Sequence, residues 1–247
     1  MFALDVTAHN GRWRLRHPGE KAFLAFGLLA CAVALPTWPG AVLSGGTAAA
    51  LLLGPARVSA VVLLRAARVP VLFVTTSAVP LLVAVQPSGG VSWNPNGAGE
   101  ALTATGRALA ALLCLLLFSA TTPLSDVIPR LRRLGVPAAV TEVAGVTYRM
   151  IFLLVDSLRT VREAQAARLG YRSWRTAYRS LAGQAAAVFV RAFARARRLE
   201  EGLALRGYVG SLAVQVEPRR VSPGFVAATL ALLAAVVVAS LRLRGPS

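Results

Sequence analysis

Two segments in the second half of the sequence end in a similar arrangement of arginine and glycine. The first, residues 163–171, reads EAQAARLGY, and the second, residues 201–208, reads EGLALRGY. A glutamate, an alanine and an arginine match between them at an offset of 38 residues, and the Gly-Tyr pair matches at an offset of 37. We refer to these segments as the first and second arginine motifs.

Each motif predicts the exposed end of a helix that carries one guanidinium group. Good helix formers lead into a glycine, which suits the left-handed residue that ends many helices. An arginine in the last turn is favoured by the helix dipole, and its planar fork can pair with a carboxylate through two hydrogen bonds. Ordinary helix ends use the same residue types, but two copies favour a binding role. The candidate docking residues are Ala167, Arg168, Gly170, Ala204, Arg206 and Gly207.

Few other residues in the sequence could support catalysis or metal binding. Both cysteines lie in apolar runs, and both histidines lie in the polar N-terminal segment without partner ligands. No Cys/His spacing typical of a metal site occurs, and neither does a glycine-rich phosphate-binding loop. We therefore expect no catalytic residue, no metal site and no cofactor in this chain.

The elements that would position the motifs lie in an unusually apolar chain. Hydrophobic residues make up 56% of the sequence and charged residues 15%, compared with about 25% charged residues in soluble domains. Several apolar runs approach the roughly 20 residues that a membrane helix needs. Residues 57–69 carry Arg65 and Arg68 three positions apart, so we expect that stretch at the interface or buried against protein. The apolar runs are Ala22–Leu35, Ala41–Leu53, Pro70–Val85, Ala101–Ala120 and Phe225–Leu241.

The basic residues are concentrated downstream of these runs. Residues 124–220 contain seventeen arginines and seven acidic residues, in a chain with a net charge of +17. Their pattern predicts amphipathic helices at residues 124–134, 137–170 and 173–206. The basic charge is consistent with a cytoplasmic loop bias, with anionic lipid headgroups or with an acidic protein partner. Nucleic acid is disfavoured as a partner because no nucleic-acid-binding motif accompanies the charge.

The sequence therefore predicts an all-α polytopic membrane protein of about five to six membrane helices with long cytoplasmic helices. We expect N-terminal membrane helices over residues 1–123, the cytoplasmic helices with both arginine motifs over 124–220, and a C-terminal membrane helix over 221–247. The positive-inside rule places the basic region in the cytoplasm and the uncharged residues 86–99 outside.

The paired motifs resemble the two Ala-Arg-Gly signatures of the transmembrane T component of energy-coupling factor (ECF) transporters. Similar sequence surrounds them: TTPL at 121–124, LRRLGVP at 131–137, Tyr148-Arg149, and RARRLEEGLALRGY at 195–208. The resemblance is strong over residues 100–212 and mostly a matter of hydropathy before that.

Residues 167–174, ARLGYRSW, resemble most closely the cobalt-type branch of this family, usually called CbiQ. Two residues depart from its signature. Leu169 stands where the first motif is expected to have glycine, and Leu205 stands where the second is expected to have alanine. Both motifs keep the arginine and a nearby glycine, so docking is expected to survive these departures.

The resemblance implies a non-catalytic coupling subunit in the plasma membrane. In this family the T component joins two ABC-type ATPases to a separate substrate-binding membrane subunit, and each arginine motif docks on one ATPase. ATP-driven closure then moves the coupling helices, whose motion passes to the substrate subunit. The branch implies uptake of cobalt ion for cobalamin biosynthesis. Another micronutrient, such as nickel or a vitamin, remains an alternative, as do an unrelated permease and a membrane scaffold. Membrane lipid is a further expected partner.

Overall fold

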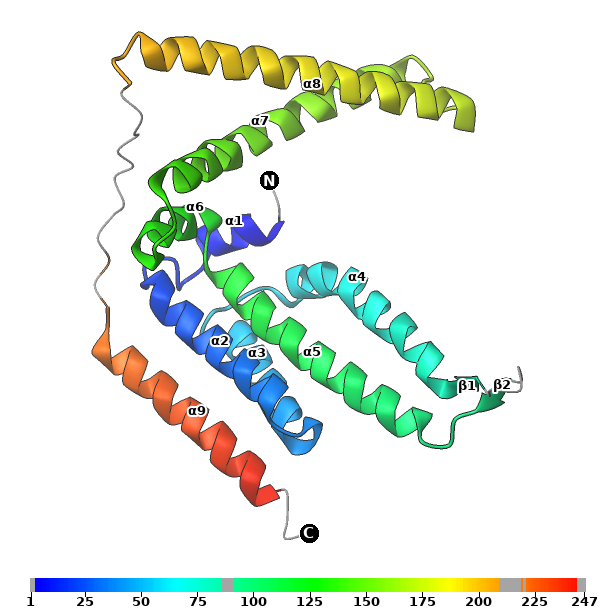
Figure 1. Ribbon diagram of the computed structural model, residues 1–247, viewed down its shortest axis with the longest axis vertical. Helices are drawn as coiled ribbons and strands as arrows, with labels where there is room; N and C mark the ends of the chain where they lie inside the picture. Colours follow the sequence, from blue (N-terminus) through cyan, green and yellow to red (C-terminus); the bar gives the residue numbers. More distant parts are fainter. Residues whose placement is uncertain (1–2, 86–90, 209–218, 220, 244–247) are drawn as a thin grey trace. The chain divides into compact units, whose positions relative to one another are not determined.

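The computed structural model describes residues 3–85, 91–208, 219 and 221–243 (Figure 1). The chain forms two compact units. The first comprises Met1–Leu124 and Glu217–Ser247, and the second comprises Ser125–Val216. Apart from one short pair of strands, the regular structure of the described residues is helical, which confirms the predicted all-α class.

The first unit is a bundle in which α5 packs against α1, α2, α3 and α4. Leu28 of α2, Leu52 of α3, and Cys114 and Leu117 of α5 are buried together between these helices. The elements of this unit are α1 (Ala3–Asn10), α2 (Pro18–Ala34), the π-helical turn η1 (Thr37–Ala41), α3 (Val42–Leu53), α4 (Ala60–Ala78), the 3₁₀ turn η2 (Val79–Leu82), β1 (Val83–Val85), β2 (Val91–Trp93), α5 (Gly97–Thr121) and α9 (Pro223–Leu243).

Local sequence signals explain where α2 begins and ends. His17 precedes the helix, and its Nδ1 atom accepts a hydrogen bond from the backbone N–H of Gly19. Pro18 follows at the first helical position, where its lack of an N–H costs nothing. Pro36 follows Leu35 at the other end, and the residue before a proline is disfavoured in helical geometry. The apolar runs Ala22–Leu35 and Ala41–Leu53 correspond to α2 and α3, which pack against each other.

One predicted boundary is wrong. Residues 57–69 and 70–85 were expected as separate segments, but Ala60–Ala78 form one continuous helix with Pro70 inside it. Arg65 and Arg68 are exposed in the first half of α4, and long side chains can reach polar surroundings while their stems cover apolar surface. Proline is tolerated within membrane helices, because nearby groups satisfy the backbone atoms that it frees.

Four of the described helices are long and apolar enough to cross a membrane: α4 with η2, α5, α7 (Ala138–Ala167) and α9. The helix formed by η1 and α3 (Thr37–Leu53) is apolar but shorter. Of the uncharged residues 86–99, the first five lie outside the described residues. Val91–Trp93 then pair antiparallel with Val83–Val85, and Gly97 opens α5.

The second unit is dominated by two long helices, α7 (Ala138–Ala167) and α8 (Trp174–Ala204), which form a hairpin (Figure 1). Ser173 starts α8 with a capping box, in which its side chain accepts from the Thr176 N–H and the Thr176 side chain accepts from the Ser173 N–H. Such reciprocal bonds satisfy two backbone donors at a helix start. Before α7, the chain forms α6 (Leu124–Val127), at the boundary of the units, and the 3₁₀ helix η3 (Ile128–Leu134), which packs against α7.

Candidate functional site

The first arginine motif closes the end of α7 with two backbone hydrogen bonds. The N–H of Leu169 donates to the carbonyl of Ala166 at 3.0 Å, and the N–H of Gly170 donates to the carbonyl of Gln165 at 2.9 Å. Leu169 has a left-handed backbone, with φ of 58°. These two bonds around a left-handed residue define the Schellman motif, which satisfies carbonyls at a helix end.

The second arginine motif ends α8 in the same way. The N–H of Gly207 donates to the carbonyl of Ala204 at 3.1 Å, and the N–H of Tyr208 donates to the carbonyl of Leu203 at 3.1 Å. Here the left-handed residue is Gly207, with φ of 70°. The two helix ends therefore share one backbone geometry.

This geometry aligns the motifs at the offset of 38 residues, and it corrects one expectation. Arg168 and Arg206 occupy equivalent positions, each immediately before the left-handed residue. The two glycines are not equivalent, because Gly207 matches Leu169 and Gly170 matches Tyr208. The expectation that glycine takes the left-handed position holds for the second motif and is wrong for the first, where Leu169 takes it.

Gly170 is explained by close packing instead. A Cβ atom at this position would lie 2.5 Å from Ser180 Oγ and 2.8 Å from the carbonyl oxygen of Gln165. The Ser180 hydroxyl donates to the Gly170 carbonyl at 2.9 Å, and Ser180 is buried. The glycine thus allows the end of α7 to approach the second turn of α8.

Both arginine side chains are exposed. Within the described residues, Arg168 and Arg206 take part in no ion pair and no side-chain hydrogen bond. Each lies at a helix C-terminus, where carbonyl groups carry partial negative charge and favour a cation. The two helix ends therefore each present one exposed guanidinium group.

Several contacts that no sequence pattern indicates hold α7 and α8 together. Gln184 is buried on α8, and its Nε2 donates to the carbonyl of Leu158 on α7 at 2.9 Å. The hydroxyl of Tyr171 reaches Gln184 Oε1 at 3.4 Å, and Arg191 donates to Ser157 Oγ at 2.7 Å. These side chains connect residues 13 to 34 positions apart.

A further contact ties the second motif to the start of α7. The Tyr208 hydroxyl donates to Glu142 Oε1 at 2.8 Å, and this bond raises the pKa of Tyr208 because the phenolate could not donate. On α7 itself, Asp156 and Arg159 form an exposed ion pair, with 4.0 Å between the carboxylate and guanidinium atoms.

The motifs lie at opposite ends of α8 (Figure 1). The helix has 31 residues, which is roughly 45 Å at 1.5 Å per residue. The two arginine-bearing helix ends are therefore separated by about the length of α8.

Together, the apolar helices and the paired motifs define an α-helical multi-pass membrane protein with two cationic helix ends. The CbiQ family model, described as cobalt transport protein, matches residues 10–218. The cobalt transport protein CbiQ of Rhodobacter capsulatus is 39% identical over 241 residues, which cover 98% of each chain. The chain belongs to the CbiQ family, and the resemblance to this branch is confirmed.

Two other relatives match about half of the chain. The cobalt transport protein CbiQ of Salmonella typhimurium is 35% identical over 104 residues, which cover 42% of this chain and 46% of the relative. A putative fused cobalt transport protein CbiMQ of Methanocorpusculum labreanum is 26% identical over 117 residues, or 47% of this chain and 20% of the relative.

Proposed function

We propose that this chain is the transmembrane coupling (T) subunit of an ECF-type ABC importer that takes up cobalt ion. Membership of the CbiQ family supports the substrate, as does similarity along nearly the whole chain to a protein named for cobalt transport. The subunit would lie in the plasma membrane with residues 124–220 in the cytoplasm, because basic segments favour that side.

The observation that carries the proposal is the repeated helix end. Arg168 and Arg206 precede left-handed residues in two Schellman motifs with the same pair of hydrogen bonds. Two copies of one geometry, roughly a helix length apart, suit two copies of one partner. In the proposal these partners are the two ABC-type ATPases, and each guanidinium pairs with a carboxylate in a groove of one ATPase.

The docking sites would include small residues beside each arginine, which let a partner approach the helix end. These are Ala167 in the first motif, and Ala204 and Gly207 in the second. Gly170 would support the first site indirectly, by letting the end of α7 pack against Ser180. The chain would contribute no catalytic group, because ATP hydrolysis belongs to the ATPases.

The helical hairpin would carry motion between its partners. Closure of the ATPases on ATP would shift the two ends of α8, and the contacts of Gln184 with Leu158 would pass that shift to α7. The receiving partner would be a separate substrate-binding membrane subunit. The fused CbiMQ relative supports partnership with another cobalt transport subunit.

The test is substitution of both arginines. Removing one partner of a desolvated charge pair typically costs about 2–5 kcal/mol, so we expect Arg168→Ala or Arg206→Ala to weaken copurification of the ATPases. The double substitution should nearly abolish it while the protein still accumulates in the membrane. Lysine at both positions should rescue only partly, because an ammonium group cannot form the bidentate fork.

Arg175→Ala is the matched control, since Arg175 is also exposed and on α8. It should leave copurification and cobalt uptake close to those of the unmodified protein. Full retention of the ATPases by the double variant would show that the motifs are ordinary helix ends.

A further inference from the structure

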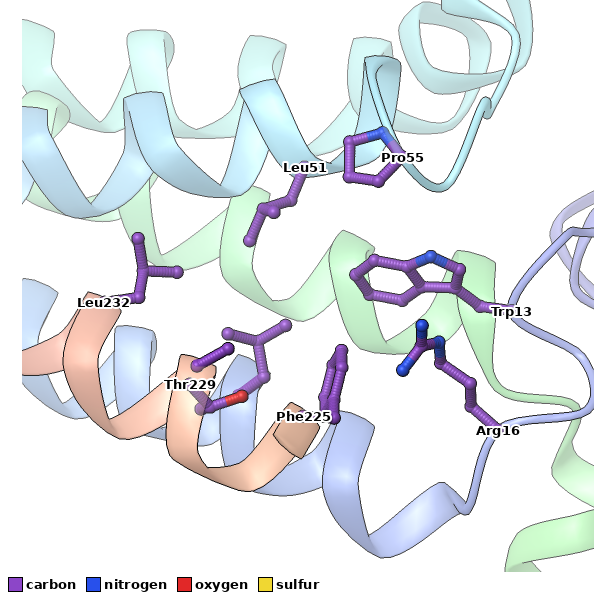
Figure 2. Close-up of a pocket in the computed structure, with 9 residues that line it drawn as sticks. Trp13, Arg16, Leu51, Pro55, Phe225, Thr229 and Leu232 are labelled. Atoms are coloured by element: carbon purple, nitrogen blue, oxygen red, sulfur yellow. The ribbon is translucent and has the colours of Figure 1, made fainter. Parts of the chain in front are cut away.

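An apolar crevice opens beside the first turns of α9 in the first unit (Figure 2). Its volume is about 240 Å³. An apolar cavity of about 150 Å³ admits a benzene molecule, so the crevice has room for part of an alkyl chain. The apolar side chains that line it include Leu24, Leu51, Pro55, Phe225 and Leu232.

α9 supplies one wall through a regular face. Phe225, Ala228, Thr229 and Leu232 line the crevice, and their spacing of three and four residues places them on one side of a helix. α9 begins at Pro223 and is apolar enough to cross a membrane. If α9 crosses the membrane, the crevice along its first turns lies where the hydrocarbon region gives way to the headgroups.

The rim of the crevice is aromatic and cationic. The Arg16 guanidinium lies 4.6 Å from the centre of the Phe225 ring, and Trp13 meets the same ring edge-on at 5.8 Å (Figure 2). Trp13 is buried, whereas Arg16 is exposed, as are its neighbours Arg12 and Arg14. Among the described residues, none of these three arginines pairs with a carboxylate.

Other charged residues hold this rim in place. Lys21 is buried, and its ammonium group donates to the carbonyl of Trp13 at 3.1 Å and to that of Thr121 at 2.7 Å. Glu20 accepts the backbone N–H of Ser222, just before α9, and Arg219 donates to the carbonyl of Arg14. These bonds fix the positions of Trp13 and α9 relative to α2. Lys21 and Glu20 are buried, so the exposed charge at the rim is that of Arg16.

We propose that this crevice binds an anionic phospholipid of the surrounding membrane. One acyl chain enters between α2, α3 and α9, and the phosphodiester group pairs with Arg16 at the rim. The arginine fork suits phosphate oxygens, and the tryptophan beside it is a residue favoured at headgroup level. A zwitterionic lipid fits the apolar part equally well, but its own cation is repelled by Arg16. The site is independent of any ATPase or substrate subunit.

Quenching of Trp13 fluorescence by lipids brominated on their acyl chains tests the site. The full chain, with Trp38, Trp93 and Trp174 replaced by phenylalanine, is reconstituted in bilayers that contain brominated phosphatidylglycerol or brominated phosphatidylcholine. Each arginine near an anionic surface contributes about 1 kcal/mol, so we expect half-maximal quenching at an about fivefold lower mole fraction of phosphatidylglycerol.

Two substitutions distinguish recognition of the lipid headgroup from binding of the acyl chain. Arg16→Gln should remove the preference for phosphatidylglycerol, and Ala228→Phe should fill the crevice and reduce quenching by both lipids. Arg242→Gln is the matched control, because it removes one exposed charge at the other end of α9 and should change nothing. Equal quenching by both lipids in the starting protein would overturn the proposal. So would an effect of Arg242→Gln as large as that of Arg16→Gln.

Discussion

At the scale of single residues, the two arginine motifs differ mainly in the free energy that the left-handed backbone conformation costs. Leu169 has φ of 58°, while Gly207 takes the equivalent position with φ of 70°. A left-handed conformation costs roughly 1–2 kcal/mol for a residue with a Cβ atom and little for glycine. The Leu169 side chain is 65% exposed, so packing offsets little of this cost. Leucine in place of glycine at position 169 therefore raises the conformational cost of this helix end but leaves the position of Arg168 unchanged.

Leu169→Gly should therefore stabilise the end of α7. We expect a gain of about 1 kcal/mol, because glycine adopts the left-handed conformation without strain; the greater freedom of glycine in the unfolded chain offsets part of the relief. Slower amide hydrogen exchange at residues 169 and 170, together with a higher melting temperature in detergent, would measure the gain.

Leu205→Gly is the matched control in the second motif. Leu205 is also exposed, but its φ is −64°, in the ordinary helical region. Glycine there should destabilise the helix end by about 0.5–1 kcal/mol. Equal effects of the two substitutions would contradict the conformational explanation.

The arginines were predictable from the sequence, but their surroundings were not. Arg168 and Arg206 could be found because the helix-ending pattern is local and occurs twice. The role of Gly170 depends on Ser180, ten positions away, and Tyr208 meets Glu142 across 66 positions. Such contacts depend on how α7 and α8 cross, which periodicity within either helix does not specify.

At the scale of elements, the long helices were predictable where apolar periodicity and end signals agreed. The expected helices at 137–170 and 173–206 correspond to α7 and α8 with ends displaced by one to three residues. The segment at 57–69 was misassigned because Arg65, Arg68 and Pro70 all count against a single apolar helix. An apolar helix tolerates a charged residue when its long side chain reaches polar surroundings. A hydropathy pattern does not show whether a side chain can do so.

The proposed orientation predicts the accessibility of two introduced cysteines. In a protein without Cys31 and Cys114, Gly99→Cys should react with a membrane-impermeant maleimide in intact cells. Ala182→Cys should react only after permeabilisation, since the basic region favours the cytoplasm. Both sites are exposed, and a Cβ atom at Gly99 has no neighbour within 4 Å.

Arg133→Cys provides the control for α7, which is itself long and apolar enough to cross a membrane. Arg133 is exposed and precedes α7, whereas Ala182 follows it. If α7 stays in the cytoplasm, the two sites react under the same conditions. Reaction of one site in intact cells and of the other only after permeabilisation would show that α7 crosses the membrane and would contradict the proposed orientation.

At the scale of the whole molecule, the proposed function separates binding from transmission. The guanidinium groups of Arg168 and Arg206 would bind the ATPases, while the contacts between α8 and α7 would pass on their motion. Gln184 belongs to the second group, because it is buried between the helices and lies about ten residues from α8's N-terminal end. Substitutions at Gln184 and at the arginines should therefore have different consequences.

Gln184→Leu should reduce cobalt uptake severalfold while the amount of copurified ATPase stays nearly unchanged. Leucine cannot donate to the Leu158 carbonyl or accept from Tyr171, and loss of such a bond costs about 1–3 kcal/mol at a buried site. Ala185→Leu introduces the same side chain at the exposed neighbouring position of α8 and should leave both quantities unchanged. Uptake and copurification are measured on the same membranes for each variant. A fall in uptake that is matched by an equal loss of ATPase would show that Gln184 supports assembly, and the separation of binding from transmission would then be wrong.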